Sequence, residues 1–160
     1  MSEDLDVKWL AARRWLDSIR RAAISIESLV REISALEDAR DEMLGWRTKG
    51  TGPGTHGMGA HSDPTATAAE QRMCELDELI DAKRGELQRK IADVGACGDV
   101  LSAMAMSIGM GHAKAIELYY IDCAPTWSDV AYEMGVNVKR LYRLRIEAYA
   151  WIEARQGDIL

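Results

Sequence analysis

The sequence predicts an all-α protein in which a long helical arm precedes a sigma-like helix-turn-helix domain. Apolar residues recur at helical spacing along most of the 160 residues. Only three prolines occur, and β-branched residues are sparse, which favours helix over strand. Near the end of the chain, a helix-capping pattern, a glycine and a second capping residue follow one another. We expect the arm to occupy residues 1–106 and the helix-turn-helix domain to occupy residues 107–160.

The first long helix is predicted from a seam of apolar residues at alternating steps of four and three. This seam consists of Leu5, Trp9, Ala12, Leu16, Ile19, Ala23, Ile26, Val30 and Ile33. The stripe then drifts to Leu29, Leu36 and Met43, as a slightly mis-wound helix allows. Because a helix with one apolar stripe gains most of its stability from packing, this helix needs a partner.

A second apolar stripe supplies a candidate partner. It consists of Met73, Leu76, Ile80, Leu87, Ile91 and Val94, and its spacing continues through Cys97, Leu101, Met104 and Ile108. Gly95 and Gly98 can kink or end this helix. Two arrangements satisfy both stripes: an antiparallel hairpin within one chain, able to pair with a second copy, or a parallel dimer through the first helix. Either way we expect a homo-oligomer formed through the arm.

The stretch between the two stripes, residues 45–64, is rich in glycine and contains two prolines. This composition predicts a mobile connection that is not helical. Ser62 or Asp63 can cap the next helix, with Pro64 at its first position.

The same stretch contains patterns that are found in binding sites. A literal G-x-G-x-x-G occurs at Gly52, Gly54 and Gly57, but a dinucleotide fold needs a strand before it and a long helix is predicted there. His56, His61 and Cys74 fit no zinc spacing. No group of residues suggests a nucleophile with its base. We therefore predict no metal, no cofactor and no enzymatic activity.

The composition limits the cellular locations and the kinds of partner that we expect. The net charge of −6 argues against a general nucleic-acid coat but permits a specific DNA reader whose cations are concentrated on one helix. No apolar run follows the acidic N-terminus, and the most apolar stretch, residues 100–110, is too short to span a bilayer. The three cysteines share no motif spacing, which suits a reducing compartment. We expect a cytoplasmic protein without membrane contact.

The helix-turn-helix is predicted between Thr126 and Ile146. Thr126 and Asp129 form a capping-box pattern after Pro125, and Gly135 allows the left-handed backbone that ends a helix abruptly. Asn137 can then cap a second helix. Val136 is expected to fill the turn, and four apolar side chains are expected to fill the wedge between the two helices: Val130, Met134, Leu141 and Leu144.

Between Asn137 and Ile146, the second helix of this motif carries four cations and no acid. Lys139, Arg140, Arg143 and Arg145 are the cations, and Lys139, Tyr142 and Arg143 fall on the face opposite Leu141 and Leu144. A recognition helix presents such side chains to phosphates and base edges in the major groove. The predicted DNA-binding residues are Asn137, Lys139, Arg140, Tyr142 and Arg143. The alternative is a helical hairpin with a solvated basic face.

The segment after Lys114, AIELYYIDCAPTWSDVAYEMGVNVKRLYRLRIEAYAWI, resembles region four of bacterial sigma factors. It is more similar to the C-terminal halves of small phage-encoded transcriptional regulators of the ArpU and RinA kind. The residues that carry the resemblance are Tyr119-Tyr120-Ile121, Thr126-Trp127, Val130-Ala131 and Ala148. The recognition helix opens with Asn137-Val138, where those relatives more usually have a serine.

The resemblance implies a sequence-specific regulator of transcription that binds double-stranded DNA and can also contact RNA polymerase. Two alternatives remain open. One is a small terminase-like DNA-packaging protein, which also joins a helix-turn-helix to oligomerising helices. The other is an interaction module that binds RNA polymerase without DNA.

Overall fold

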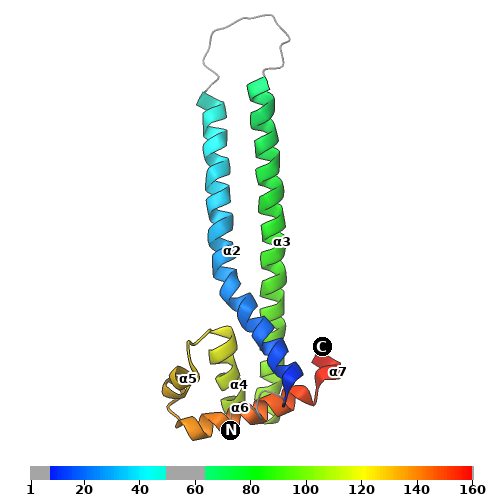
Figure 1. Ribbon diagram of the computed structural model, residues 1–160, viewed down its shortest axis with the longest axis vertical. Helices are drawn as coiled ribbons and strands as arrows, with labels where there is room; N and C mark the ends of the chain where they lie inside the picture. Colours follow the sequence, from blue (N-terminus) through cyan, green and yellow to red (C-terminus); the bar gives the residue numbers. More distant parts are fainter. Residues whose placement is uncertain (1–7, 50–63, 160) are drawn as a thin grey trace, which may run out of the picture. The chain divides into compact units, whose positions relative to one another are not determined.

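The computed structural model describes residues 8–49 and 64–159, and all of its regular elements are helical (Figure 1). In chain order they are α2 (Leu10–Lys49), α3 (Pro64–Ser107), α4 (Met110–Ile116), the π-helical turn η1 (Glu117–Ile121), α5 (Trp127–Met134), α6 (Val138–Glu153) and α7 (Gln156–Ile159). The predicted all-α class and its long helical arm are confirmed. None of the described helices combines the length and apolarity that crossing a membrane requires.

Helix α2 extends further than the sequence patterns predict. Residues 45–49 are helical, so the expectation that the whole of 45–64 is non-helical is wrong. This segment contains a single glycine, Gly45, and one glycine costs a helix only about 1 kcal/mol. Helix α3 begins at Pro64 as predicted and runs unbroken through Gly95 and Gly98. The remaining linker predictions, on the glycines at 52, 54 and 57 and the histidines at 56 and 61, lie outside the described residues.

The described residues group into two compact units. The arm unit comprises Glu27–Gln88, and the head unit comprises the residues up to Ile26 together with those from Arg89 onward. The head unit therefore contains the beginning of α2 and the end of α3 as well as the predicted domain at 107–160.

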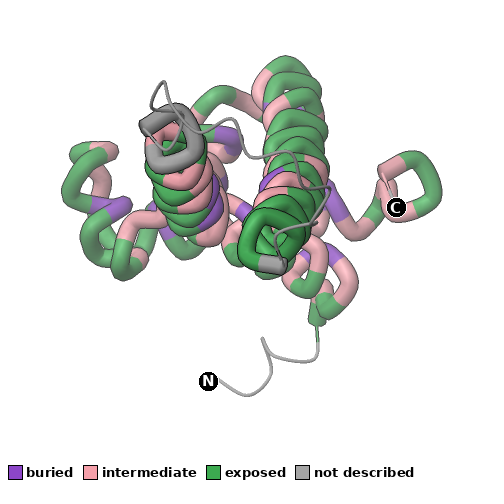
Figure 2. Tube along the Cα trace, turned by 90° about the horizontal axis from the view of Figure 1, so that it is seen from above, coloured by how far each residue is buried: buried purple, intermediate pink, exposed green. Residues whose placement is uncertain are grey.

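In the arm unit, α2 and α3 run antiparallel within one chain. Leu29, Ile33 and Ile80 are buried, and the buried positions lie where the two helices face each other (Figure 2). Arg40 pairs with Asp77 at 2.7 Å and Lys83 with Glu32 at 2.6 Å, and Arg84 pairs with Glu37. Glu32 pairs with Lys83 and Arg40 pairs with Asp77, so a step forward along α2 corresponds to a step back along α3. This is the intramolecular hairpin of the two arrangements that the apolar stripes allow.

The buried face of α2 departs from the predicted seam in its second half. Ala12, Leu16, Ile19 and Ile33 are buried as expected. Between them, however, Ala22 is buried and Val30 is 50% exposed, whereas Leu29 is buried as the predicted drift of the stripe requires. A strict 3.5-residue repeat does not hold across this part of α2, because a straight helix drifts relative to it.

The core of the head unit joins α2 and α3 to the C-terminal helices. Its fully buried members include Leu16 of α2, Met104 of α3, Ile116 of α4 and Ile152 of α6. A second cluster, Ala115, Leu118, Val130, Ala131 and Leu141, packs α4 and η1 against α5 and α6. These two cores fix the orientation of α6.

Candidate nucleic-acid interface

The helix-turn-helix has the capping interactions that its sequence predicts. The Thr126 hydroxyl accepts a hydrogen bond from the Asp129 backbone N–H at 3.2 Å, and the Asp129 carboxylate accepts one from the Thr126 N–H at 3.0 Å. Gly135 ends α5 with φ of 64°, a left-handed conformation in which a side chain is strained. The Asn137 amide oxygen accepts from the Arg140 N–H at 2.8 Å and starts α6.

The turn between α5 and α6 is a Schellman motif. Val136 N–H donates to the Ala131 carbonyl at 3.0 Å, and Gly135 N–H donates to the Tyr132 carbonyl at 3.1 Å. Ala131 is 4% exposed, which places a small residue at a buried position beside this turn. The angle at which α6 leaves α5 is thus determined by backbone bonds as well as by packing.

The apolar wedge is mostly as predicted. Val130 and Leu141 are buried in it, with Met134 and Val136 half-buried against them. Leu144 is the exception, because it is half-buried and lies next to Gly111 of α4. Leu144 therefore joins α6 to α4 and is not part of the wedge.

The predicted DNA-binding residues all lie on the accessible side of α6. Lys139, Arg140 and Arg143 are exposed, and Tyr142 is 40% exposed. Asn137 is exposed too, but its amide oxygen already accepts the capping bond, which leaves its NH₂ group and one oxygen lone pair for another partner. Lys139 and Arg143 are one helical turn apart on one face. The residues chosen from the sequence are thus brought together, with Asn137 mainly in a structural role.

The described part of the chain does not neutralise the charges on this face through ion pairs. Within residues 8–49 and 64–159, no carboxylate forms an ion pair with Lys139, Arg140 or Arg143. By contrast, Lys114 pairs with Glu117 at 3.0 Å, which raises the pKa of the Lys114 ammonium. Glu147, the first acid of α6, is bonded to His112 at 2.6 Å. The first half of α6 therefore carries positive charge that no described carboxylate pairs with.

Behind this face, two arginines flank a pair of stacked aromatic rings. The Arg20 guanidinium lies 4.2 Å from the centroid of the Tyr119 ring, and Tyr119 stacks on Trp127. On the other side, the Arg145 guanidinium lies 4.8 Å from the centroid of the Trp127 ring. This arginine–aromatic stack, Arg20–Tyr119–Trp127–Arg145, joins α2 to α6 inside the head unit.

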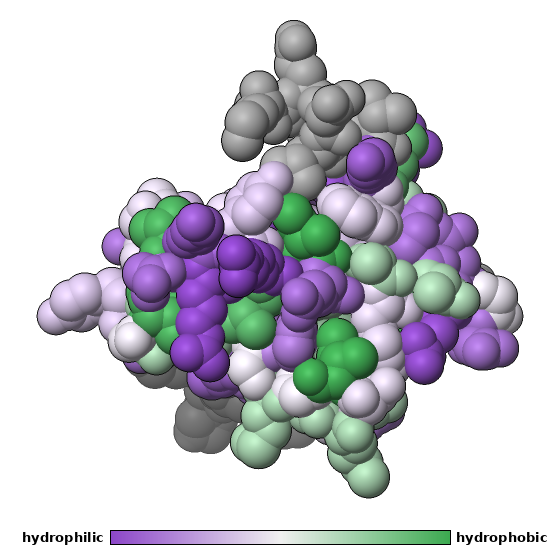
Figure 3. Space-filling view, turned by 90° about the horizontal axis from the view of Figure 1, so that it is seen from below, coloured by the Kyte–Doolittle hydropathy of each residue, from purple (hydrophilic) through white to green (hydrophobic). Residues whose placement is uncertain are grey.

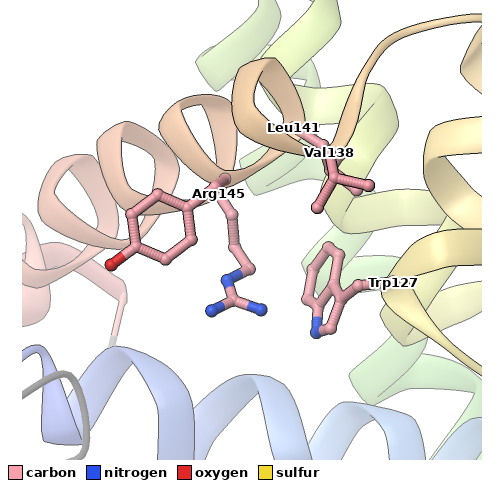
Figure 4. A pocket seen from close by; sticks show the side chains of 5 residues that line it. Trp127, Val138, Leu141 and Arg145 are labelled. Atoms are coloured by element: carbon pink, nitrogen blue, oxygen red, sulfur yellow. The ribbon is translucent and has the colours of Figure 1, made fainter. Parts of the chain in front are cut away.

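Arg145 and Val138 are two residues that sequence reasoning did not place in the site. Val138, Tyr142 and Arg145 follow one another at steps of four and three, a row on one side of α6 that the sequence contains. With Trp127 and Leu141 they line a small pocket between the start of α5 and α6 (Figure 4). Arg145 extends from α6 so that its guanidinium lies beside Trp127 in this pocket (Figure 4).

The surface that α6 crosses is chemically mixed. Strongly hydrophilic side chains lie next to hydrophobic ones on this side of the head unit (Figure 3). Val138, 64% exposed, and Tyr142 are apolar or aromatic members of the surface, and Lys139 and Arg143 are charged members. Cationic and apolar groups side by side match the two kinds of contact that a major groove offers.

Among the described residues, no three histidine, cysteine or acidic side chains come together as a metal-binding group. Comparison with models of protein families, with curated proteins and with solved structures finds no match to this chain.

Proposed function

We propose that the protein is a sequence-specific DNA-binding regulator of transcription, with α6 as its recognition helix. The observation that carries this proposal is the set of exposed cations on the first half of a capped recognition helix, Lys139, Arg140 and Arg143, none of which pairs with a described carboxylate. Duplex DNA is the partner that supplies both the missing negative charge and a groove wide enough for a helix.

A solvated basic face explains these observations less well. A purely solvated helix needs no exposed valine at its first position, and Val138 is a weaker helix former than most alternatives. The wedge, the Schellman turn and both caps hold the face at a defined angle. A surface held at a defined angle is suited to binding a rigid partner.

The resemblance to sigma region four and to phage regulators of the ArpU and RinA kind supports a role in transcription. On this proposal the protein acts in the cytoplasm, has no catalytic role, and forms homo-oligomers through its arm that set the spacing of half-sites. RNA polymerase is a further partner that the resemblance implies.

The test is binding of the full chain to a duplex selected from a random library. The logarithm of affinity should fall with the logarithm of salt concentration with a slope of about −3, if three cations each neutralise one phosphate. Replacing Lys139, Arg140 and Arg143 by Gln should abolish this slope. Replacing the exposed Arg14, Arg72 and Arg89 by Gln changes the net charge equally and should leave it nearly unchanged.

Three outcomes would contradict the proposal. Failure to enrich any duplex would leave binding to RNA polymerase alone as the better interpretation. An equal loss in both triple variants would mean that net charge, and not this face, determines binding. A closed ring in light scattering, together with weak sequence preference, would favour a DNA-packaging role.

A further inference from the structure

We infer that the pocket beside α6 receives the methyl group of a thymine, so that the recognised duplex contains a thymine whose methyl is read by Val138, Tyr142 and Trp127. This inference rests on the proposed function. It goes beyond that proposal by naming one base of the recognised duplex. It also assigns a binding role to Val138, which is not part of the cationic face.

The pocket has the chemistry of a methyl receptor. Four of its five lining residues present carbon: Trp127, Val138, Leu141 and Tyr142. Its remaining wall is Arg145, whose Nε is buried without a hydrogen-bond partner among the described residues. No carboxylate lines it. The apolar lining therefore suits an uncharged apolar group. The arginine at its edge suits a molecule that carries negative charge elsewhere.

The position of the pocket selects duplex DNA as that molecule. Val138 and Tyr142 are one turn apart on α6, and Lys139 and Arg143 are the residues next to them in the chain, so the apolar pair and the cationic pair run in parallel. When the phosphates of a major groove lie against Lys139 and Arg143, the edges of the bases in that groove lie against the pocket. In the major groove, thymine is the base that presents a methyl group.

Two of the side chains at the pocket, Val138 and Tyr142, are exposed for no evident structural reason. Val138 is 64% exposed and Tyr142 is 40% exposed, while the wedge of the motif is filled by Val130, Ala131 and Leu141. Removing Val138 should therefore leave the fold intact. This separation makes the inference testable by substitution.

The experiment replaces each thymine of the selected duplex by uracil, which removes only the methyl group. At one or two positions the affinity should fall about fourfold per methyl, the change expected when one buried methyl is lost. At the other positions it should stay within error. If the full chain binds the duplex specifically but no single uracil weakens binding, this inference is overturned and the proposed function stands.

A coupled substitution identifies the pocket as the receptor. In Val138→Ser, the difference in affinity between the thymine and uracil duplexes should shrink at the sensitive position, because the methyl has lost one of its contacts. The matched control is Tyr132→Ala, which removes an aromatic residue that is 90% exposed on α5 and is not among the residues that line the pocket; it should keep the full uracil effect. Circular dichroism checks that both variants are folded. If uracil weakens binding as much in Val138→Ser as in wild type, the methyl binds elsewhere. If the wild-type protein binds no duplex at all, the proposed function itself is refuted.

Discussion

The rings of Tyr119 and Trp127 lie nearly parallel, with centroids 4.0 Å apart and 13° between their planes. Tyr119 belongs to the π-helical turn and Trp127 is the first residue of α5, so their contact ties the helix before the motif to the motif itself. Arg20 holds this turn in place, because its guanidinium donates to the carbonyls of Tyr119 and, at 3.0 Å, of Ala124.

The first prediction concerns this arginine. Arg20→Lys keeps the charge but cannot span both carbonyls with one planar fork, so the free energy of unfolding should fall by about 1–2 kcal/mol. Urea denaturation measures the change. The matched control is Arg21→Lys at the exposed neighbouring position, for which we expect little effect. Equal effects at the two positions would show that the fork does not stabilise the turn.

The second prediction concerns Arg143, which is exposed on the face of α6 that we assign to DNA. Arg143→Ala should weaken specific duplex binding by about 1–3 kcal/mol without unfolding the protein, because a charged contact to a base or phosphate is lost. Fluorescence anisotropy with the selected duplex measures it. The control Arg72→Ala removes the same charge from the arm unit and should change the free energy of duplex binding little. Unchanged binding in an Arg140→Ala, Arg143→Ala double variant would rule out this assignment.

The third prediction uses two adjacent residues of α2 with opposite exposure. Leu29→Asp places a charge at a position only 5% exposed and should destabilise the arm by about 3 kcal/mol or more. Val30→Asp, at a half-exposed position, should cost well under 1 kcal/mol. Thermal unfolding measures both. The interpretation of the arm's buried face fails if the two variants are equally destabilised.

The Val30 variant also tests the oligomer that the arm is expected to form. If a second copy covers the exposed apolar residues of the arm, Val30→Asp should lower the mass in sedimentation while helicity is retained. An unchanged mass above that of one chain would place the contact elsewhere. A wild type that sediments as a single chain would contradict the expected homo-oligomer.

The fourth prediction concerns alkaline pH. Burial raises the pKa of the Cys97 thiol to about 12, so between its ordinary value and about 12 the unfolded chain releases this proton while the folded chain keeps it. The free energy of unfolding should then fall by about 1.4 kcal/mol per pH unit from this group as pH rises above about 8.5. Burial raises the pKa values of Tyr120 and Tyr149 as well, which adds to the fall at higher pH.

Substitution of the cysteine isolates its share. Urea denaturation at several pH values measures the free energy of unfolding. Between pH 8.5 and 10 it should fall less steeply in Cys97→Ala than in wild type. In Cys74→Ala, which removes an exposed thiol, it should fall as in wild type. Parallel curves for all three proteins would mean that Cys97 is accessible to solvent in the folded state.

The parts of the site that follow local chemistry could be predicted from the sequence. Thr126 with Asp129, Gly135 and Asn137 each act over a few residues, so their spacing in the chain determines their contacts. The exposed cations of α6 follow from the period of the helix. Contacts over long separations could not be predicted in this way. Arg20 meets the Tyr119 carbonyl ninety-nine positions along the chain, and no pattern of residue types marks that pair.

The arm shows a second limit of sequence patterns. The seam predicted Val30 as buried, but which of Leu29 and Val30 faces the partner helix depends on the register between α2 and α3. That register is determined by Ile80 and by the ion pairs of the arm unit, which lie on another helix. The pocket beside Trp127 was missed for a related reason, since it needs the angle between α5 and α6 as well as the sequence of each.

One hydrogen bond has a consequence for the order of events on the ribosome. The Ala12 N–H, in the first turn of α2, donates to the Glu153 carboxylate at 2.8 Å, so the start of α2 is capped by the last residue of α6. Residues up to Ile26 also share their core with residues from Arg89 onward. The opening segment therefore leaves the exit tunnel long before its packing partners are synthesised. The arm unit, which is continuous in the chain, can form its hairpin while the first segment still waits for the last one.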